Sequence, residues 1–286
     1  MITFFERLNM ARLLSRNLFS LLLLCFLVAC ATTTKQGSVG VERKQFMMFS
    51  ERQVESMSLR SYMQTLQTAQ KKNTLNNDPA VVERVRKIAN RLIEQTPVFR
   101  SDARQWKWEV NVETNEQVNA YCMPGGKIMV FTGLIDKLMV SDDELAAVMG
   151  HEMSHALREH GRERMSLAAA QSGGVAIIAA LLSSSKNRAA ANAGVQAAAM
   201  GSQLFFALPN SRTQEVEADR MGLELSARAG YDPNAAISLW QKMAQQSDKK
   251  PPEFLSTHPS DENRMNDLRR LIPTVMPLYQ QAKSNS

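Results

Sequence analysis

The short run His151-Glu152-Met153-Ser154-His155 contains the residue types that a zinc-dependent peptidase needs. Such enzymes bind zinc through neutral imidazoles and a carboxylate, leave one position open for water, and hold a base beside it. Positions four apart on an α-helix lie about 40° apart around its axis, so His151 and His155 can bind one ion. Glu152 then lies next to the bound water and can take its proton.

The alternative interpretation of this run is an ordinary solvated helix face, because the pentapeptide alone is only moderately specific. Three of the four histidines in the chain fall in this segment, and apolar residues recur at helical spacing from Leu145 to Met149. Ser141 and Glu144 have the spacing of a capping box. We therefore predict a structured amphipathic helix that begins at Ser141 and continues to about Arg164.

A carboxylate is the expected third ligand. His160 lies nine residues after His151, which on one continuous helix is about 180° around the axis, so we do not expect it to bind the ion. A later segment offers Glu215, Glu217 and Asp219. Glu215 and Asp219 share a helix face and Glu217 turns away from it, and we favour Glu215.

Two motifs that follow one another resemble the HtpX and CAAX prenyl protease family of gluzincin zinc metallopeptidases. The first is the pentapeptide and the second is Ser211-Arg212-x-x-Glu215-x-Glu217-Ala218-Asp219. The chain lacks long uninterrupted membrane-spanning segments, so it is most similar to the periplasmic lipoprotein branch of that family. The similarity covers roughly residues 81–271 and includes residues 119–121, 124–126 and 132–134, His258-Pro259 and Arg264.

The resemblance implies that His151, His155 and Glu215 bind one Zn²⁺ per chain. It implies that zinc polarises the peptide carbonyl, while Glu152 deprotonates water and later protonates the leaving amine. It also implies an α+β, mostly α fold, namely a zincin-like (gluzincin) metallopeptidase domain with a small β-sheet.

Three further residues have more than one possible role. Asp219 either accepts a hydrogen bond from a ligating histidine or helps to deliver a proton, unless it is a plain surface carboxylate. His258 either stabilises the oxyanion of the reaction or occupies the open position of zinc as a latch, and Arg264 can support either role. The simpler alternative is a solvated loop histidine and a surface arginine.

The remaining pattern predicts helices around a small sheet. Residues 106–112 alternate as a half-buried strand, and residues 120–123 and 127–132 flank Pro124-Gly125-Gly126 as a hairpin. An exposed strand of this hairpin could pair with an extended substrate, or the hairpin could be a simple turn. Helical periods cover residues 42–71, 79–95, 214–229 and 232–246, and residues 167–208 have the composition of a helical hairpin.

The amino terminus has the features of a secretory signal. Three arginines precede the apolar run 18–29, and Ala29-Cys30 ends a sequence that resembles a bacterial lipobox. We expect acylated Cys30 to tether the mature protein, and the alternative is a plain signal anchor. Because residue 31 is Ala and not Asp, we expect a periplasmic protein whose lipid anchor inserts into the inner leaflet of the outer membrane.

Composition limits the possible partners. Basic and acidic residues are interspersed, the net charge is +6, and no aromatic-basic stripe occurs, so we expect no nucleic-acid partner. Cys122 would be the one cysteine left after signal cleavage and lipidation, and we expect a buried, inert thiol. The 17 methionines lie at helical apolar positions, which favours core packing over a metal-binding surface.

We divide the chain into a lipoprotein signal peptide (1–29), a tether with an N-terminal helical segment (30–77) and a zinc metallopeptidase domain (78–286). The expected function is a metalloendopeptidase of the bacterial cell envelope that degrades misfolded or stalled envelope and outer-membrane polypeptides. The alternative is a lipoprotein chaperone or assembly factor whose zinc is structural or latched. The sequence does not specify an oligomeric state.

Overall fold

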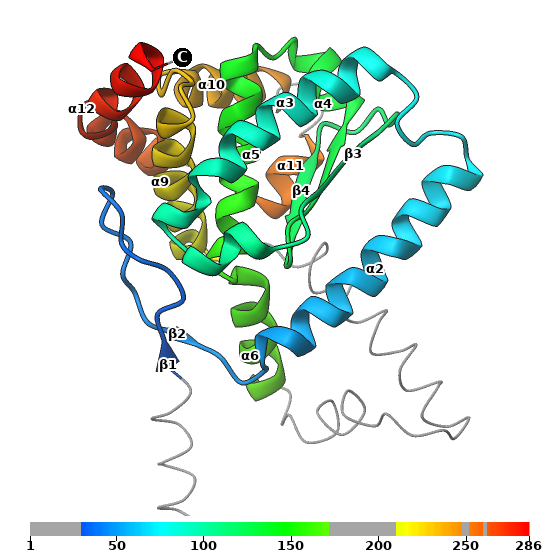
Figure 1. Ribbon diagram of the computed structural model, residues 1–286, viewed down its shortest axis with the longest axis horizontal. Coiled ribbons are helices and arrows are strands. Elements are labelled where there is room, and N and C mark those ends of the chain that lie inside the picture. Colours follow the sequence, from blue (N-terminus) through cyan, green and yellow to red (C-terminus); the bar gives the residue numbers. More distant parts are fainter. Residues whose placement is uncertain (1–29, 172–209, 248–251, 260–261, 286) are drawn as a thin grey trace, which may run out of the picture.

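A computed structural model describes residues 30–171, 210–247, 252–259 and 262–285 (Figure 1). The architecture is α+β and mostly helical, as predicted. The predicted signal peptide and most of the Ala-rich segment 167–208 lie outside the described residues. Among the described residues, no helix is long and apolar enough to cross a membrane. The helices are α2 (Glu51–Lys71), α3 (Pro79–Gln95), α4 (Thr132–Leu138), α5 (Asp142–Leu157), α6 (His160–Gln171), α9 (Arg212–Arg228), α10 (Ala235–Ser247), α11 (Glu253–Thr257) and α12 (Glu262–Ser284), with 3₁₀ turns at Thr96–Val98 and Ser101–Gln105.

The small sheet has the strand order β3-β5-β4, built from β3 (Glu109–Glu113), β4 (Ala120–Met123) and β5 (Lys127–Phe131). β3 pairs parallel to β5, and β4 pairs antiparallel to β5 and forms one edge. Gly125 and Gly126 both have positive φ values, of 80° and 77°, which a tight turn between β4 and β5 needs. The predicted hairpin is therefore confirmed, and the first strand begins at Glu109 instead of Trp106.

The N-terminus of α5 is fixed by the expected capping box. Glu144 N donates to Ser141 Oγ at 3.2 Å, and Ser141 N donates to Glu144 Oε2 at 2.8 Å. The prediction that this helix continues to about Arg164 is wrong, because α5 ends at Leu157 and Glu159 adopts a φ of +56°. The chain turns there because the carbonyl of Arg158 is bound by Gln45 Nε2, at 2.8 Å, instead of by the next helical turn.

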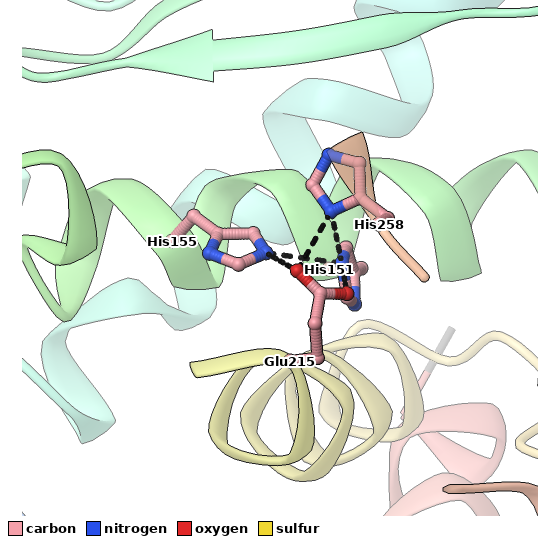
Figure 2. A group of neighbouring side chains, drawn as sticks. All are labelled: His151, His155, Glu215 and His258. Carbon is pink, nitrogen blue, oxygen red and sulfur yellow. Dashed lines mark hydrogen bonds and ion pairs between the residues drawn. The ribbon is translucent and has the colours of Figure 1, made fainter. Parts of the chain in front are cut away.

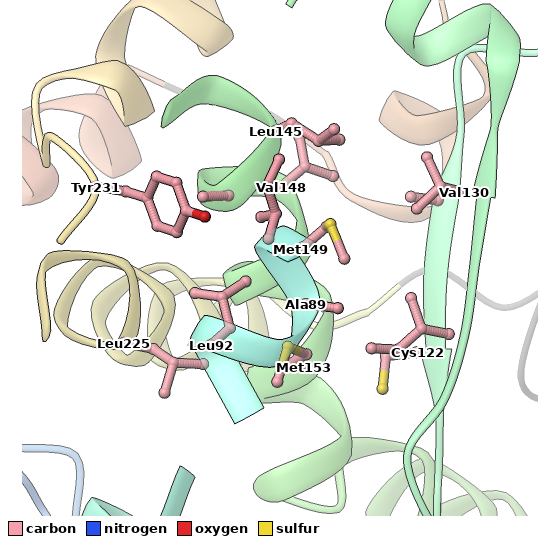
Figure 3. Close-up of a cluster of buried hydrophobic side chains, with 14 of the residues drawn as sticks. Ala89, Leu92, Cys122, Val130, Leu145, Val148, Met149, Met153, Leu225 and Tyr231 are labelled. Carbon is pink, nitrogen blue, oxygen red and sulfur yellow. The ribbon is translucent and has the colours of Figure 1, made fainter. Parts of the chain in front are cut away.

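Helix α5 is the centre of the molecule and packs against α9 on one side and β4 on another (Figure 1). The α5–α9 crossing is close: a Cβ on Gly222 would lie 2.7 Å from the backbone nitrogen of His151, so only glycine fits there. This contact brings the histidines of α5 near the carboxylates of α9. Figure 3 shows the apolar cluster that α5 shares with α3, α9 and the sheet, including Ala89, Leu92, Cys122, Val130, Leu145, Val148, Met149, Met153, Leu225 and Tyr231.

The segment that precedes α2 is packed against the body of the protein. Val39 and Val41 are each 3% exposed and belong to the main core. The prediction of a helix from Glu42 is wrong at its start, because the short strands β1 (Cys30–Ala31) and β2 (Gln45–Phe46) pair antiparallel and α2 begins only after Ser50. Ser50 caps α2, and its hydrogen bond with Gln53 completes a second capping box.

Candidate metal centre

Four buried side chains from three elements converge on one point (Figure 2). His151 and His155 come from successive turns of α5, Glu215 comes from the first turn of α9, and His258 follows α11. Each offers one nitrogen or oxygen, and these atoms all lie within 4.8 Å of one another. Three of these residues are the predicted ligands, and the fourth is the predicted loop histidine.

These atoms lie close enough together to contact one metal ion. His151 Nε2 lies 3.1 Å from His155 Nε2 and 3.2 Å from His258 Nδ1. Glu215 Oε1 lies 3.3 Å from His155 Nε2 and 3.0 Å from His258 Nδ1. Ligands bonded at about 2.0–2.1 Å to a tetrahedral ion are about 3.3 Å apart, which is close to these separations. The donor set is therefore one that could bind a metal ion.

Glu152 lies beside this group and is not part of it. Its side chain is buried, its Oε1 accepts no hydrogen bond, and the same oxygen lies 3.4 Å from His258 Nε2. Burial raises the pKa of Glu152 above the ordinary value of a glutamate. A carboxylate with a raised pKa and an oxygen that accepts no hydrogen bond is suited to accept and return a proton.

His151 is supported by a buried ion pair. Its Nδ1 lies 3.0 Å from Asp219 Oδ1, and Arg264 donates to both oxygens of Asp219 at 2.6 and 2.8 Å. The guanidinium of Arg264 also lies over the ring of Trp240 and 2.9 Å from Glu215 Oε2. Burial alone would raise the pKa of Asp219, but the charge of Arg264 and the hydrogen bonds lower it overall.

The outer nitrogen of His155 is supported by residues that were not predicted to lie near it. This nitrogen, Nδ1, lies 2.8 Å from His160 Nδ1, and His160 Nε2 lies 3.0 Å from Glu217 Oε2. The prediction that His160 is on the opposite face is wrong, because the chain turns between α5 and α6. Burial would raise the pKa of Glu217, but hydrogen bonds with His160 and Arg43 lower it to about 2.

A cleft runs from the edge strand β4 to the group of four residues. Its walls include β4 itself, Glu152, His155 and His258, together with Arg164 from α6 and Thr65 from α2. Cys122 lies along it and is 8% exposed, and burial raises the pKa of its thiol, as expected for an inert cysteine. Arg164 was not predicted from the sequence, because its place in the cleft depends on the turn before α6.

Comparisons with known proteins agree with this geometry. The model of the family described as peptidase family M48 matches residues 79–272. The chain is 40% identical over 179 residues to mitochondrial metalloendopeptidase OMA1 of Arabidopsis thaliana, which covers 62% of this chain and 34% of that protein. It is 36% identical over 177 residues to metalloendopeptidase OMA1, mitochondrial, of Bos taurus, covering 60% of this chain and 34% of that protein.

A third relative is the beta-barrel assembly-enhancing protease of Yersinia pestis. The identity is 29% over 206 residues, which is 70% of this chain and 40% of the relative. The aligned region thus spans only about a third to two fifths of the length of these curated relatives.

Proposed function

Because the chain belongs to peptidase family M48, we propose that it is a zinc-dependent metalloendopeptidase whose zinc is bound by His151, His155 and Glu215. The observation that supports this function most strongly is the spacing of three nitrogens and one oxygen around a single point, with the buried carboxylate of Glu152 beside them. Two histidines and a glutamate with one further position are typical of catalytic zinc sites.

Zinc in this site would polarise the substrate carbonyl and lower the pKa of a water molecule. Glu152 takes the proton of that water and returns it to the leaving amine, for which its raised pKa is suited. Asp219 and Arg264 keep the ring of His151 in place, and neither is among the residues that line the cleft. His258 Nδ1 lies 3.2 Å from His151 Nε2 and 3.0 Å from Glu215 Oε1, so in a zinc-bound site it would compete with water for the remaining position.

Strand β4 is the proposed site for the substrate backbone. One side of β4 pairs with β5, and residues 120–124 line the cleft that contains Glu152. An extended polypeptide can add to such an edge through main-chain hydrogen bonds. Binding of this kind requires an unfolded segment and little sequence specificity, which supports misfolded polypeptides as substrates.

The proposed location is the periplasmic side of the outer membrane, with acylated Cys30 as the anchor and misfolded or stalled envelope proteins as substrates. The lipobox-like sequence and the named function of the Yersinia pestis relative support this assignment. Replacement of Cys30 by Ser should release the protein into the soluble periplasmic fraction. Continued membrane association of the Cys30→Ser variant would contradict the lipid anchor.

Substitution of Glu152 tests the catalytic function. Glu152→Gln keeps the size of the side chain and removes the base, so we expect casein cleavage to fall about 10²–10⁴-fold while one zinc per chain is retained. The measurements are cleavage rate and metal content on the full chain.

Two variants make this test specific. Glu83→Gln, on the exposed face of α3, removes a carboxylate far from the cleft and should cleave like the wild type. Glu215→Ala should lose both zinc and cleavage. A Glu152→Gln variant that binds zinc and still cleaves at the wild-type rate would refute the proposed mechanism.

A further inference from the structure

A buried chain of hydrogen-bonding groups connects His155 to the N-terminal segment. His160 is fully buried and lies between His155 Nδ1, at 2.8 Å, and Glu217 Oε2, at 3.0 Å. Arg43 donates to both oxygens of Glu217, at 2.8 and 3.1 Å. Arg158 lies 3.4 Å from the same carboxylate. None of these four residues belongs to the group of four at the metal centre.

The charged carboxylate of Glu217 determines which group donates and which accepts in each hydrogen bond between these side chains. Two guanidinium groups beside Glu217 favour its carboxylate form, and a carboxylate can only accept. His160 must therefore donate through Nε2, which leaves Nδ1 of a neutral His160 as an acceptor. His155 must then donate through its own Nδ1, and its Nε2 keeps the lone pair that faces the metal position.

We propose that His160 and Glu217 are positioning residues that fix the tautomer and the ring orientation of the zinc ligand His155, and that Arg43 fixes Glu217. This inference rests on the proposed zinc site. Hydrogen bonds to the outer nitrogen of a ligating histidine typically change metal affinity about 10–100-fold. The N-terminal segment that follows Cys30 thus contributes to the site although it is distant from it in sequence.

The arrangement also explains two features that catalysis does not use. The turn at Arg158 and Glu159 ends α5 directly after His155 and turns His160 back toward it. Arg158 is fully buried, donates to the carbonyl of Arg43, and so keeps the N-terminal segment against this turn. A simple continuation of α5 would separate His160 from His155 and would leave Glu217 without its histidine.

A pair of substitutions at His160 tests the proposal. In His160→Gln the side-chain oxygen can accept from His155 and the side-chain amide can donate to Glu217. The donor and acceptor roles of the side chain at position 160 are therefore preserved. In His160→Leu the volume is filled but both hydrogen bonds are lost. We expect the zinc affinity, measured by chelator competition, to fall about 10–100-fold in His160→Leu and to stay near the wild-type value in His160→Gln.

A second pair on α9 separates positioning from stability. Glu217→Gln should weaken zinc binding and alter the absorption spectrum of the cobalt-substituted protein. Glu224 is also fully buried on α9 and bonds the N-terminal segment at Ser38 and Val39, but it contacts no histidine. Glu224→Gln should therefore lower stability without changing zinc affinity or the cobalt spectrum.

The outcomes distinguish this proposal from the proposed function. Equal zinc affinity in the Leu and Gln variants of His160, or equal effects of Glu217→Gln and Glu224→Gln, would overturn the positioning role while wild-type zinc binding and cleavage remain. A wild-type chain that binds no zinc would overturn the proposed function and the positioning role together. If His160→Leu does not fold, the pair on α9 decides the question.

Discussion

His151 and His155 lie one helical turn apart on α5 and face the same point, yet their outer nitrogens are supported from opposite ends of the chain. His151 contacts the carboxylate of Asp219 directly, and Arg264 of α12 binds that carboxylate with two hydrogen bonds. His155 reaches its carboxylate only through His160, and the cation that fixes this carboxylate comes from the N-terminal segment.

The difference separates the site into two halves with different origins. The residues that support His151 all lie within the region that matches peptidase family M48, residues 79–272. Arg43, which completes the support of His155, lies outside that region. The residues that support His151 thus lie within the matched region, whereas the support of His155 also includes a contact from the segment before it.

Removal of Asp219 is the strongest test of this contrast. Asp219→Ala deletes the partner of His151 and removes a carboxylate that binds the buried Arg264, although Glu215 Oε2 still lies 2.9 Å from Arg264. Loss of one partner of a buried pair costs about 3–5 kcal/mol, and loss of the histidine support costs about 10–100-fold in zinc affinity. Urea unfolding and chelator competition measure the two effects.

The matching variant on the other side is Glu217→Ala. We expect a smaller loss of stability, because Arg43 retains Glu163, at 2.5 Å, and Arg158 retains Thr34. Arg43 is also partly exposed, so water can compensate for part of the lost contact. If Glu217→Ala destabilises the protein more than Asp219→Ala does, the direct support is not the stronger of the two.

His258 is the member of the group that belongs to neither half. Its Nδ1 lies 3.0 Å from Glu215 and 3.2 Å from His151, and Asn210 lies 3.3 Å from the same nitrogen. We expect His258→Ala to increase casein cleavage, because in the proposed zinc site the imidazole of His258 would compete with water for the remaining position. A tenfold increase would correspond to about 1.4 kcal/mol for opening of the wild-type site.

The opposite result would assign His258 another role. A lower cleavage rate with unchanged zinc content would favour stabilisation of the oxyanion, since the histidine would then act on the reacting group. Zinc content, measured on the same samples, distinguishes a weaker site from a less active one.

Much of the site could be predicted from the sequence because its ligands follow local rules. The spacing of His151 and His155 and the cap at Ser141 depend on helix geometry, which a few neighbouring residues determine. Membership of the gluzincin family followed from two ordered motifs and is confirmed by the match to peptidase family M48. The β4–β5 hairpin was predictable because Pro124-Gly125-Gly126 is a turn sequence between two strand-like segments, and its glycines can adopt the positive φ values of a tight turn.

The support of His155 could not be predicted because it depends on contacts between distant segments. The carbonyl of Arg158 is bound by Gln45 at the point where α5 ends, and this contact comes from a residue 113 positions earlier in the chain. Because the chain turns at this contact, His160 lies next to His155. The prediction assumed one continuous helix and therefore placed His160 on the wrong face. Glu217 is not one of the four converging residues, and its partners lie at residues 43, 158 and 160, which are distant from it in sequence.

The N-terminus of α5 provides a control site, because the cap there stabilises the same helix without contact to either histidine. Burial alone would raise the pKa of Glu144, but Lys242, Ser141 and Ser238 lower it below its ordinary value by hydrogen bonding. The unfolded chain then binds more protons than the folded one, so this contribution is complete above the ordinary carboxyl pKa and is lost as pH falls through the folded value. Glu144→Gln can still complete the capping box but loses the charge that faces Lys242, so we expect it to cost up to about 1 kcal/mol at neutral pH and progressively less below about pH 4.5. The zinc affinity of Glu144→Gln should equal that of the wild type. If its zinc affinity falls as much as that of His160→Leu, the stability of α5 determines metal binding, and the side chains that contact the outer nitrogens of the two histidines do not.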